Sequence, residues 1–359
     1  MQTKTTQLEI IENLHLKSKP VGDQIPFGTV MTDYMFSMDY EEGKGWHSPK
    51  IEPYAPITLD PAAMIFHYGQ TVFEGLKAYR TADDRILLFR PDENFKRLNL
   101  SSERMSIPPV DEKLILEYLK ELVSLEKDWV PGTKGTSLYI RPFIISTEPK
   151  LAVSPSRQYK MMILLAPVGS YFPGGLTPVV IHAEDSFTRA VKGGTGMAKT
   201  AGNYSAAYQA QAAAKEAGKA DVLWLDGIEK RYIEEVGSMN IFFKIDGEVV
   251  TPAMNGSILH GITRKSVIEL LESWGMKVSQ RKIAIDELFD LYEQGKVEEV
   301  FGTGTAAIVS PVGELSWKER TMKVNNGEIG ELSQKIYDTI TGIQNGSVED
   351  TFNWTVEVE

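Results

Sequence analysis

Cysteine is absent from the sequence and histidine is scarce. With no cysteine among the 359 residues, disulfide bridges, thiolate nucleophiles and cysteine metal sites are excluded. The five histidines include His67, His182 and His260, which are isolated from one another, and none of the five forms a His-x-x-x-His pair. We therefore expect no metal site, since closely spaced ligand pairs are typical of helical zinc sites.

Long apolar runs and excess basic charge are also missing. No stretch of about 18 apolar residues occurs. Residues Met1 to Pro20 are polar and lack the apolar core of a signal peptide. The 38 lysines and arginines are outnumbered by 49 aspartates and glutamates, which gives a net charge of -11. We therefore expect a cytoplasmic protein that binds neither nucleic acid nor an anionic membrane.

The length of the chain predicts two domains. The segment 169–176, Gly-Ser-Tyr-Phe-Pro-Gly-Gly-Leu, breaks every regular pattern and is the best candidate for a linker. We therefore divide the chain into a smaller N-terminal α/β domain (1–168), an interdomain linker (169–176) and a larger C-terminal domain (177–359).

The N-terminal part combines strands and helices. Residues 85–90 are predicted to form a strand, and Pro91 suits the first turn of a helix that follows it. Apolar residues at helical spacing predict a second helix over 111–129. The segments 136–145 and 159–168 are rich in β-branched and aromatic residues and are predicted to be strands of the same sheet.

The C-terminal part is predicted to contain short strands, hairpins and helices. The turn pairs Asp226-Gly227 and Asp246-Gly247 indicate two hairpins. Strands are expected at 177–183, 221–225, 232–236, 239–245 and 248–251, with a later strand pair interrupted by residues 302–305. Helices are expected at 204–217, 262–274, 286–294 and 329–343. Without a regular βαβ alternation, the pattern favours an α+β (mixed α/β) fold over a doubly wound sheet.

Lys199 lies in a glycine-rich loop that leads into an alanine-rich helix. An amine beside a helix N-terminus indicates phosphate chemistry, with either a nucleotide or pyridoxal phosphate. A nucleotide-binding P-loop would place glycine before the lysine, but Ala198 occupies that position. Asp226, which could imitate a magnesium ligand, is better explained as a turn residue because Gly227 follows it.

Pyridoxal phosphate chemistry needs an amine, an acid for the pyridine nitrogen, a donor for the phenolic oxygen and a phosphate cup. Glu234 and Glu235 are adjacent on a predicted strand, so only one of them can face a pocket. The segment 261–264 begins a helix and 302–307 is a second glycine turn, and either could bind an anion through backbone N–H groups. Arg90, at a strand end, could clamp phosphate.

Taken together, these motifs resemble the branched-chain aminotransferases, which are fold-type IV pyridoxal phosphate enzymes. The most specific motifs are 234–243, Glu-Glu-Val-Gly-Ser-Met-Asn-Ile-Phe-Phe, and 255–264, Asn-Gly-Ser-Ile-Leu-His-Gly-Ile-Thr-Arg. The resemblance extends from about residue 27 to 312 and includes the segments 68–75, 138–142, 199–204 and 301–306. It implies two domains with the cofactor between them.

The resemblance also assigns cofactor contacts. It implies that Lys199 is the catalytic amine that binds pyridoxal 5'-phosphate covalently, that Glu235 rather than Glu234 faces the pyridine nitrogen, and that Tyr204 bonds the phenolic oxygen. The phosphate would be held by Arg90, the backbone of Ile262 and Thr263, and Thr305.

The implied reaction is a ping-pong transamination between branched-chain L-amino acids and 2-oxoglutarate, which yields branched-chain 2-oxo acids and L-glutamate. Aromatic residues would form the wall for the amino-acid side chain, namely Phe27, Tyr68, Phe73 and Tyr171. Tyr139 and Arg141 would admit the second substrate's carboxylate. Ser238 would line the same space, and Thr305 and Ala306 would meet the α-carboxylate.

Other interpretations remain open. A D-amino acid transaminase or an aminodeoxychorismate lyase would share the lysine and the acid, although the segments 138–142 and 45–49 fit the branched-chain enzymes better. A degenerate P-loop protein or a noncatalytic pyridoxal phosphate carrier would use the same loop. The family also implies a homodimer. Some members carry Cys-x-x-Cys after the glycine turn, where this chain has Ala307-Ile308-Val309-Ser310, so thiol control there is excluded.

Overall fold

The structure is a computed structural model that describes residues 7–20, 22, 25–172 and 174–359. Its contacts divide the chain into two units. The first contains the described residues up to 172 together with 198–201 and 342–359, and the second contains 174–197 and 202–341. Two predicted segments lie partly outside the described residues. Residues 1–6 of the polar N-terminal stretch are outside them, and so is residue 173 of the predicted linker 169–176.

This grouping differs from the predicted division at two places. Residues 342–359 belong to the first unit because their strand pairs with a strand of that unit. Residues 198–201, including Lys199, also belong to it, because Lys199 and Thr200 hydrogen-bond to its strands and helices. Sequence alone placed both segments in the C-terminal part, since such long-range pairing leaves no local signal.

The first unit is built on a largely antiparallel sheet with the strand order β1-β3-β2-β8-β7-β5-β6-β18, and β4 pairs with β7. Its strands are β1 (Glu9–Ile10), β2 (Tyr34–Glu41), β3 (Gly45–Pro53), β4 (Thr71–Phe73), β5 (Leu76–Arg80), β6 (Ile86–Phe89), β7 (Ser137–Ser146), β8 (Gln158–Val168) and β18 (Thr355–Val358). The predicted strands at 85–90, 136–145 and 159–168 are confirmed as β6, β7 and β8.

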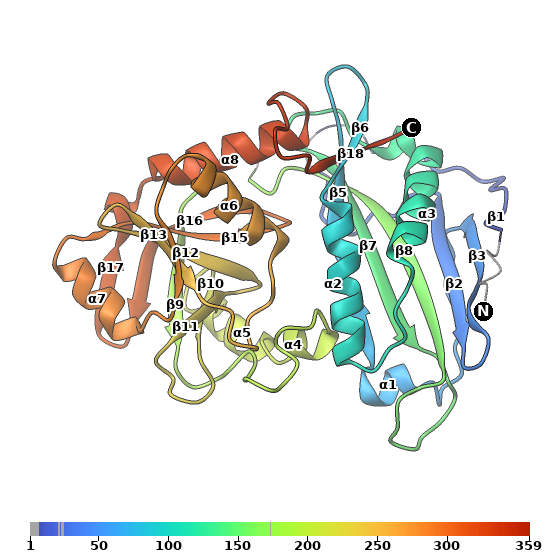
Figure 1. Ribbon diagram of the computed structural model, residues 1–359, viewed down its shortest axis with the longest axis horizontal. Helices are drawn as coiled ribbons and strands as arrows, with labels where there is room; N and C mark the ends of the chain where they lie inside the picture. Colours follow the sequence, from blue (N-terminus) through green and yellow to red (C-terminus); the bar gives the residue numbers. More distant parts are fainter. Residues whose placement is uncertain (1–6, 21, 23–24, 173) are drawn as a thin grey trace. The chain divides into compact units, whose positions relative to one another are not determined.

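Two helices, α2 (Pro91–Arg104) and α3 (Glu112–Leu125), pack side by side against this sheet (Figure 1). The Asp111 carboxylate accepts the N–H groups of Lys113 and Leu114 and so caps α3. Apolar side chains of α3, including Leu119 and Leu122, are fully buried in the core of the unit. The unit also contains α1 (Met64–Tyr68) and a short 3₁₀ helix η1 (Lys127–Trp129).

The second unit contains a sheet with the order β11-β10-β9-β16-β15-β12-β13-β14, in which β11 also pairs with β12 and closes six strands into a ring. Its strands are β9 (Val179–Glu184), β10 (Asp221–Leu225), β11 (Ile233–Val236), β12 (Met239–Ile245), β13 (Glu248–Pro252), β14 (Val278–Arg281), β15 (Val297–Gly304), β16 (Ile308–Trp317) and β17 (Arg320–Lys323). Asp246 (φ 51°) and Gly247 (φ 76°) form the tight turn predicted between β12 and β13.

The helices of the second part of the chain are α4 (Ala201–Ser205), α5 (Tyr208–Glu216), α6 (Ile262–Ser273), α7 (Ile285–Glu293) and α8 (Glu331–Gln344), with the 3₁₀ segment η2 (Val324–Gly327). The helix expected over 204–217 is divided in two, because the Ala207 N–H bonds the Tyr204 carbonyl, only three residues back. The predicted later strand pair is found as β15 and β16, but the break between the two strands lies at 305–307 rather than 302–305, because β15 extends through Gly304.

None of the helices within the described residues has the length and apolarity needed to cross a membrane. Both units combine helices with a mainly antiparallel sheet. The predicted α+β character is thus confirmed, and neither of the two sheets formed by the described residues is doubly wound.

Candidate active site

Lys199 is tied by its backbone to the first unit. Its N–H donates to Ser101 Oγ (2.9 Å), and its carbonyl accepts from the Phe73 N–H (3.0 Å). The Thr200 hydroxyl donates to the Thr71 carbonyl (2.7 Å). The half-buried Lys199 places Nζ 4.9 Å from the centre of the Phe73 ring, within cation–π range. Helix α2 and strand β4 thus fix the position of the lysine backbone.

Four of the predicted substrate residues gather in the same unit. The rings of Phe27 and Tyr139 lie 4.9 Å apart. Arg141 Nη2 donates to the Tyr139 hydroxyl (2.9 Å), and its guanidinium carbon lies 4.9 Å from the centre of the Phe73 ring. A Cβ at Gly75 would clash with the Tyr139 hydroxyl, so a larger residue there would require the Tyr139 side chain to shift. The result is an aromatic surface that carries one arginine.

Tyr68 and Tyr171 make different contacts. The Tyr68 hydroxyl donates to the Leu151 carbonyl, and the Tyr171 ring packs edge-on against Phe172, with centres 4.8 Å apart. Their exposed fractions are 41% and 54%. Their assignment to the substrate wall stays a prediction.

Arg90 is buried rather than exposed, although an exposed arginine is the commoner outcome at a strand end. It adopts a left-handed conformation (φ 49°) as the N-cap residue of α2. Its N–H donates to the Trp354 carbonyl (2.6 Å), and its guanidinium carbon lies 5.2 Å from the centre of the Trp354 ring. A left-handed conformation is uncommon for a residue other than glycine, so the surroundings must enforce it.

Lys77, which was not among the predicted site residues, pairs with Tyr139 across β5 and β7. Burial lowers the pKa of Lys77 to about 8. The sequence does not indicate this lowered pKa, because a single lysine in a strand does not reveal how deeply it will be buried.

The predicted alternation of Glu234 and Glu235 on a strand is confirmed. Both lie on β11, with exposed fractions of 2% and 3%. Glu234 Oε1 accepts from Asn255 Nδ2 (2.7 Å) and from the Ser257 hydroxyl. Glu235 makes a separate set of contacts, described next. The pair is therefore a buried structural feature rather than a solvated strand edge.

In the second unit, the Glu235 carboxylate contacts Arg189, Asn240 and Leu259. Arg189 Nε lies 2.5 Å from Oε2, an ion pair by distance rather than a hydrogen bond of good angle. Oε1 accepts from Asn240 Nδ2 (3.2 Å) and from the Leu259 N–H (3.1 Å). None of these three residues was predicted as a functional residue. Asn240 belongs to the 234–243 motif and Leu259 to the 255–264 motif, whereas Arg189 had no sequence signal.

Glu235 and Tyr204 line one pocket of the second unit, together with Ser238. Tyr204 comes from α4 and is half-buried, whereas Ser238 is exposed at the turn between β11 and β12. The structure therefore brings together three of the residues that the sequence assigned to the cofactor and substrate.

Helix α6 begins with a glycine and has no side-chain cap. The N-cap residue Gly261 leaves the N–H groups of Ile262 and Thr263 available to an anion. Both residues are largely buried, with exposed fractions of 8% and 6%. A Cβ at Gly261 would overlap Asn240 Oδ1. The helix N-terminus thus packs directly against a residue that holds Glu235.

The second glycine segment lies where β15 ends. A Cβ at Gly302 or Gly304 would lie 3.1 Å from atoms of Met239, so glycine allows this close approach. Thr305 and Ala306 follow in the turn to β16 and are half-buried. Their assignment to phosphate and carboxylate binding stays a prediction.

Asp226 is confirmed as a turn residue. Its carboxylate accepts the N–H groups of Ile228 (3.1 Å), Glu229 (2.8 Å), Arg231 (3.0 Å) and Tyr232 (2.8 Å). Although burial acts to raise it, the pKa of Asp226 stays below its ordinary value because these N–H groups stabilise the ionised form. A carboxylate occupied in this way is not free to hold magnesium, which argues against the P-loop alternative.

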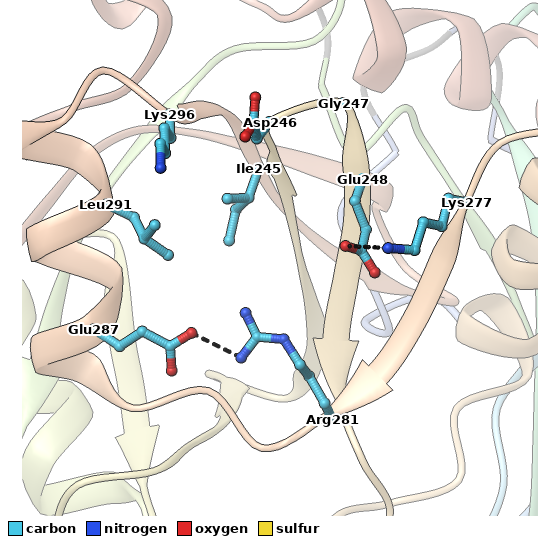
Figure 2. A pocket seen from close by; sticks show the side chains of 9 residues that line it. All are labelled: Ile245, Asp246, Gly247, Glu248, Lys277, Arg281, Glu287, Leu291 and Lys296. Carbon is cyan, nitrogen blue, oxygen red and sulfur yellow. Dashed lines mark hydrogen bonds and ion pairs between the residues drawn. The ribbon is translucent and has the colours of Figure 1, made fainter.

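A second hollow in the second unit lies where the β12–β13 hairpin, β14 and α7 meet (Figure 2). Two of its three cations are paired with carboxylates, Lys277 with Glu248 (3.1 Å) and Arg281 with Glu287 (2.8 Å). No predicted site residue lines this hollow. It therefore adds nothing to the candidate active site.

The comparison with known proteins defines the class. The chain belongs to the amino-transferase class IV family, which residues 71–315 match. It is 60% identical over 358 residues to branched-chain-amino-acid aminotransferase 2 of Bacillus subtilis (strain 168), a match that covers 100% of this chain and 98% of the relative. It is 62% identical over 352 residues to branched-chain-amino-acid transaminase 1 of the same organism, covering 98% and 99%. The predicted family is confirmed, and the chain is an aminotransferase.

Solved structures confirm the fold. The branched-chain amino acid aminotransferase of Escherichia coli aligns with a TM-score of 0.76 and 25% identity, covering 91% of this chain and 99% of that one. The branched-chain amino acid aminotransferase of Thermobaculum terrenum, in its PLP form, aligns with a TM-score of 0.74 and 21% identity, covering 91% and 98%. The predicted fold-type IV architecture is therefore confirmed.

The residues present fit pyridoxal phosphate. In the second unit, a buried carboxylate and a tyrosine line one pocket, and an uncapped helix N-terminus packs against a neighbour of that carboxylate. These are the groups needed for the ring nitrogen, the phenolic oxygen and the phosphate. In the first unit, Lys199 supplies an amine and Arg90 a buried cation.

Proposed function

We propose that the protein catalyses transamination between branched-chain L-amino acids and 2-oxoglutarate by a ping-pong mechanism, with pyridoxal 5'-phosphate as cofactor. The observation that carries this proposal is the buried Glu235 carboxylate, which three groups orient in the pocket that Tyr204 also lines. The Bacillus subtilis relatives at 60% and 62% identity, named as branched-chain aminotransferases, support this substrate class.

The cofactor, when bound, supplies an electron sink for the substrate's α-carbon. Glu235 would hold a proton on the pyridine nitrogen, since an ionised carboxylate favours a positive partner. Tyr204 would donate its hydroxyl proton in a hydrogen bond to the phenolic oxygen. Lys199 Nζ would bind the cofactor and, once displaced by the substrate amine, take the proton from the substrate Cα.

Phosphate binding would combine charge with backbone donors. Arg90 would contribute its guanidinium, and Ile262 and Thr263 would contribute their N–H groups at the start of α6. Thr305 would add a hydroxyl from the glycine turn. These groups suit a phosphate dianion because the Arg90 guanidinium is positively charged and the others are neutral hydrogen-bond donors.

The substrate pocket would use the aromatic surface of the first unit. Phe27, Phe73 and Tyr139 offer apolar faces for an aliphatic side chain. Arg141 would bind the side-chain carboxylate of 2-oxoglutarate or L-glutamate through its planar fork. One site can then accept both an aliphatic and an acidic substrate.

Several assignments complete the proposal. Tyr68, Tyr171 and Ser238 would line the substrate space, and the backbone of Thr305 and Ala306 would meet the α-carboxylate.

We further propose a homodimer that works in the cytoplasm. Size-exclusion chromatography with light scattering tests the dimer, and a mass of about 80 kDa, twice the 40.1 kDa of the chain, is the expected result.

The test is to add L-leucine to the purified, cofactor-loaded protein and record its visible absorption. We expect the yellow absorption to be lost with L-leucine, to persist with D-alanine, and to return when 2-oxoglutarate is added. Conversion by D-alanine would favour a D-amino acid transaminase. A spectrum that 2-oxoglutarate does not restore would refute the proposed second substrate.

Two lysine variants of one loop make the assay specific. Lys199→Ala is expected to abolish both the yellow absorption and turnover. Lys192→Ala removes an exposed lysine of the same loop and is expected to leave both unchanged. Normal turnover by the Lys199→Ala variant would refute the assigned mechanism. Binding of the chromophore without any turnover by the wild type would instead indicate a noncatalytic carrier.

A further inference from the structure

Arg189 is a buried arginine that contacts Glu235 but takes no step of its own in the proposed mechanism. It lies between β9 and the glycine loop, ten residues before Lys199, and only 9% of its surface is exposed. Burying a guanidinium is costly unless it meets an opposite charge and hydrogen-bond acceptors. The partners of Arg189 therefore indicate why it is buried.

Its guanidinium contacts three separate segments of the second unit. Nε lies 2.5 Å from Oε2 of Glu235, on β11. Nη2 donates to the Gly196 carbonyl (3.2 Å), in the glycine loop, and to the Ser257 carbonyl, in the segment that precedes α6. One side chain thus bridges the segments proposed to serve the cofactor ring and phosphate, and the loop that leads to Lys199.

The packing around these bonds leaves little room for adjustment. A Cβ at Gly196 would clash with the Ser257 carbonyl and lie 2.7 Å from Ala190 Cβ. The two backbones therefore touch at the place where Arg189 bonds to both carbonyls. The planar guanidinium fixes its donors relative to one another, so moving one partner would strain the others.

Arg189 also brings a positive charge into direct contact with Glu235. Arg264 is buried nearby, but its Nη2 donates to the Pro252 carbonyl (3.0 Å) and to Gln280 Oε1 (2.9 Å). Burial lowers the pKa of Arg264 to about 10, although the charge of Glu235 acts in the opposite direction. Removing Arg189 would therefore take from the buried carboxylate the positive charge that lies 2.5 Å from its Oε2.

We propose that Arg189 is a positioning residue that fixes the Glu235 carboxylate for the pyridine nitrogen and holds the glycine loop and the approach to α6 in place around it. The inference rests on the proposed function only in taking pyridoxal phosphate as the cofactor. It predicts that Arg189 controls cofactor affinity and the proton affinity of the bound cofactor, as well as turnover.

The test compares Arg189→Gln and Arg189→Lys with a matched control, Arg97→Gln. Arg97 and Glu74 form a second buried ion pair, in the first unit, at 2.7 Å and with side-chain exposures of 8% and 0%. The Arg189 pair is buried to the same extent, at 8% and 4%. Each glutamine variant therefore breaks one buried arginine–glutamate pair, but only one pair involves a proposed cofactor residue.

Equilibrium dialysis of each apoprotein with pyridoxal phosphate measures affinity, and a pH titration of the visible absorption measures the proton affinity of the bound cofactor. We expect Arg189→Gln to weaken binding at least about tenfold and to move the midpoint of the titration, because a charge-assisted contact is lost. Arg189→Lys keeps the positive charge but loses the planar guanidinium with its several donors. It should therefore change the affinity and the titration midpoint less than Arg189→Gln does. Arg97→Gln should lower thermal stability while its affinity stays within about twofold of wild type.

Unchanged affinity and an unchanged titration in both Arg189 variants would overturn the proposal. So would equal losses of affinity in Arg189→Gln and Arg97→Gln, since these would indicate a purely structural role. If Arg189→Gln does not fold, the midpoint measured for Arg189→Lys decides, and a wild-type value would refute the proposal. A wild type that binds the cofactor but does not convert L-leucine would refute the proposed function and leave this test intact.

Discussion

Replacing Gly261 with alanine would test the link between helix α6 and the Glu235 carboxylate. Gly261 has φ -66°, a value any residue can adopt, so the effect of the substitution comes from space alone. The added methyl group would overlap Asn240 Oδ1 and lie 3.1 Å from Asn240 Cγ and 3.2 Å from Arg264 Cβ. Asn240 would have to move, and its bonds to Glu235 Oε1 (3.2 Å) and the Leu259 carbonyl (3.0 Å) would break or lengthen.

The expected cost follows from these contacts. A hydrogen bond to a charged group contributes about 1.5–3 kcal/mol and a neutral one about 0.5–1.5 kcal/mol. Overpacking by one methyl group costs about 1–3 kcal/mol. Because Asn240 can relax in part, we expect a total loss of about 2–4 kcal/mol. This corresponds to a melting temperature lowered by roughly 5–15 °C for a unit of this size.

The assay is thermal unfolding of the apoprotein followed by titration with pyridoxal phosphate. Gly174→Ala is the control, because a Cβ there meets no atom within 4 Å and its φ is not positive. We expect the control to match wild type and Gly261→Ala to melt earlier and bind the cofactor more weakly. If Gly261→Ala retained both properties, the packing of Asn240 between α6 and Glu235 would be refuted.

Three further variants test individual parts of the structure. Asp111→Ala should destabilise the first unit by about 1 kcal/mol, because two N–H groups of α3 lose their cap, and an unchanged thermal melt would contradict this. Asp226→Ala should destabilise the second unit by about 1–3 kcal/mol without creating or removing magnesium-dependent nucleotide binding, which calorimetry would detect. Burial raises the pKa of Glu126 from 4.5 to about 7, so the stability it contributes is complete below about pH 4.5 and is lost as the pH rises through 7. Glu126→Gln should therefore flatten the urea-unfolding stability profile between pH 5 and 7.5 by up to about 3 kcal/mol, and an unchanged slope would refute the assignment.

Local sequence patterns predicted many elements well. The Asp246-Gly247 pair specified a tight turn because both residues tolerate positive φ, and the flanking strands 239–245 and 248–252 follow from it. The period of two residues in a strand correctly separated Glu234 from Glu235. In both cases the information lies within a few residues of the chain.

Features that depend on distant residues were missed. Strand β18 forms by pairing with β6, more than 250 residues earlier, and nothing in the segment 355–358 reveals that partner. Arg189 has no motif of its own, and its importance appears only when Glu235, Gly196 and Ser257 converge on it. The burial of Arg90 against Trp354 is of the same kind. Tertiary contacts rather than local propensity decide these cases.

The most direct test of the central claim is the amount of branched-chain 2-oxo acid that the cofactor-loaded enzyme releases from excess L-leucine when no acceptor is present. Transamination through a bound cofactor that accepts the amino group predicts one equivalent of 2-oxo acid per bound cofactor, followed by a halt until 2-oxoglutarate is added. L-Glutamate should then appear in equal amount. No release of 2-oxo acid, or continued release without an acceptor, would contradict the account.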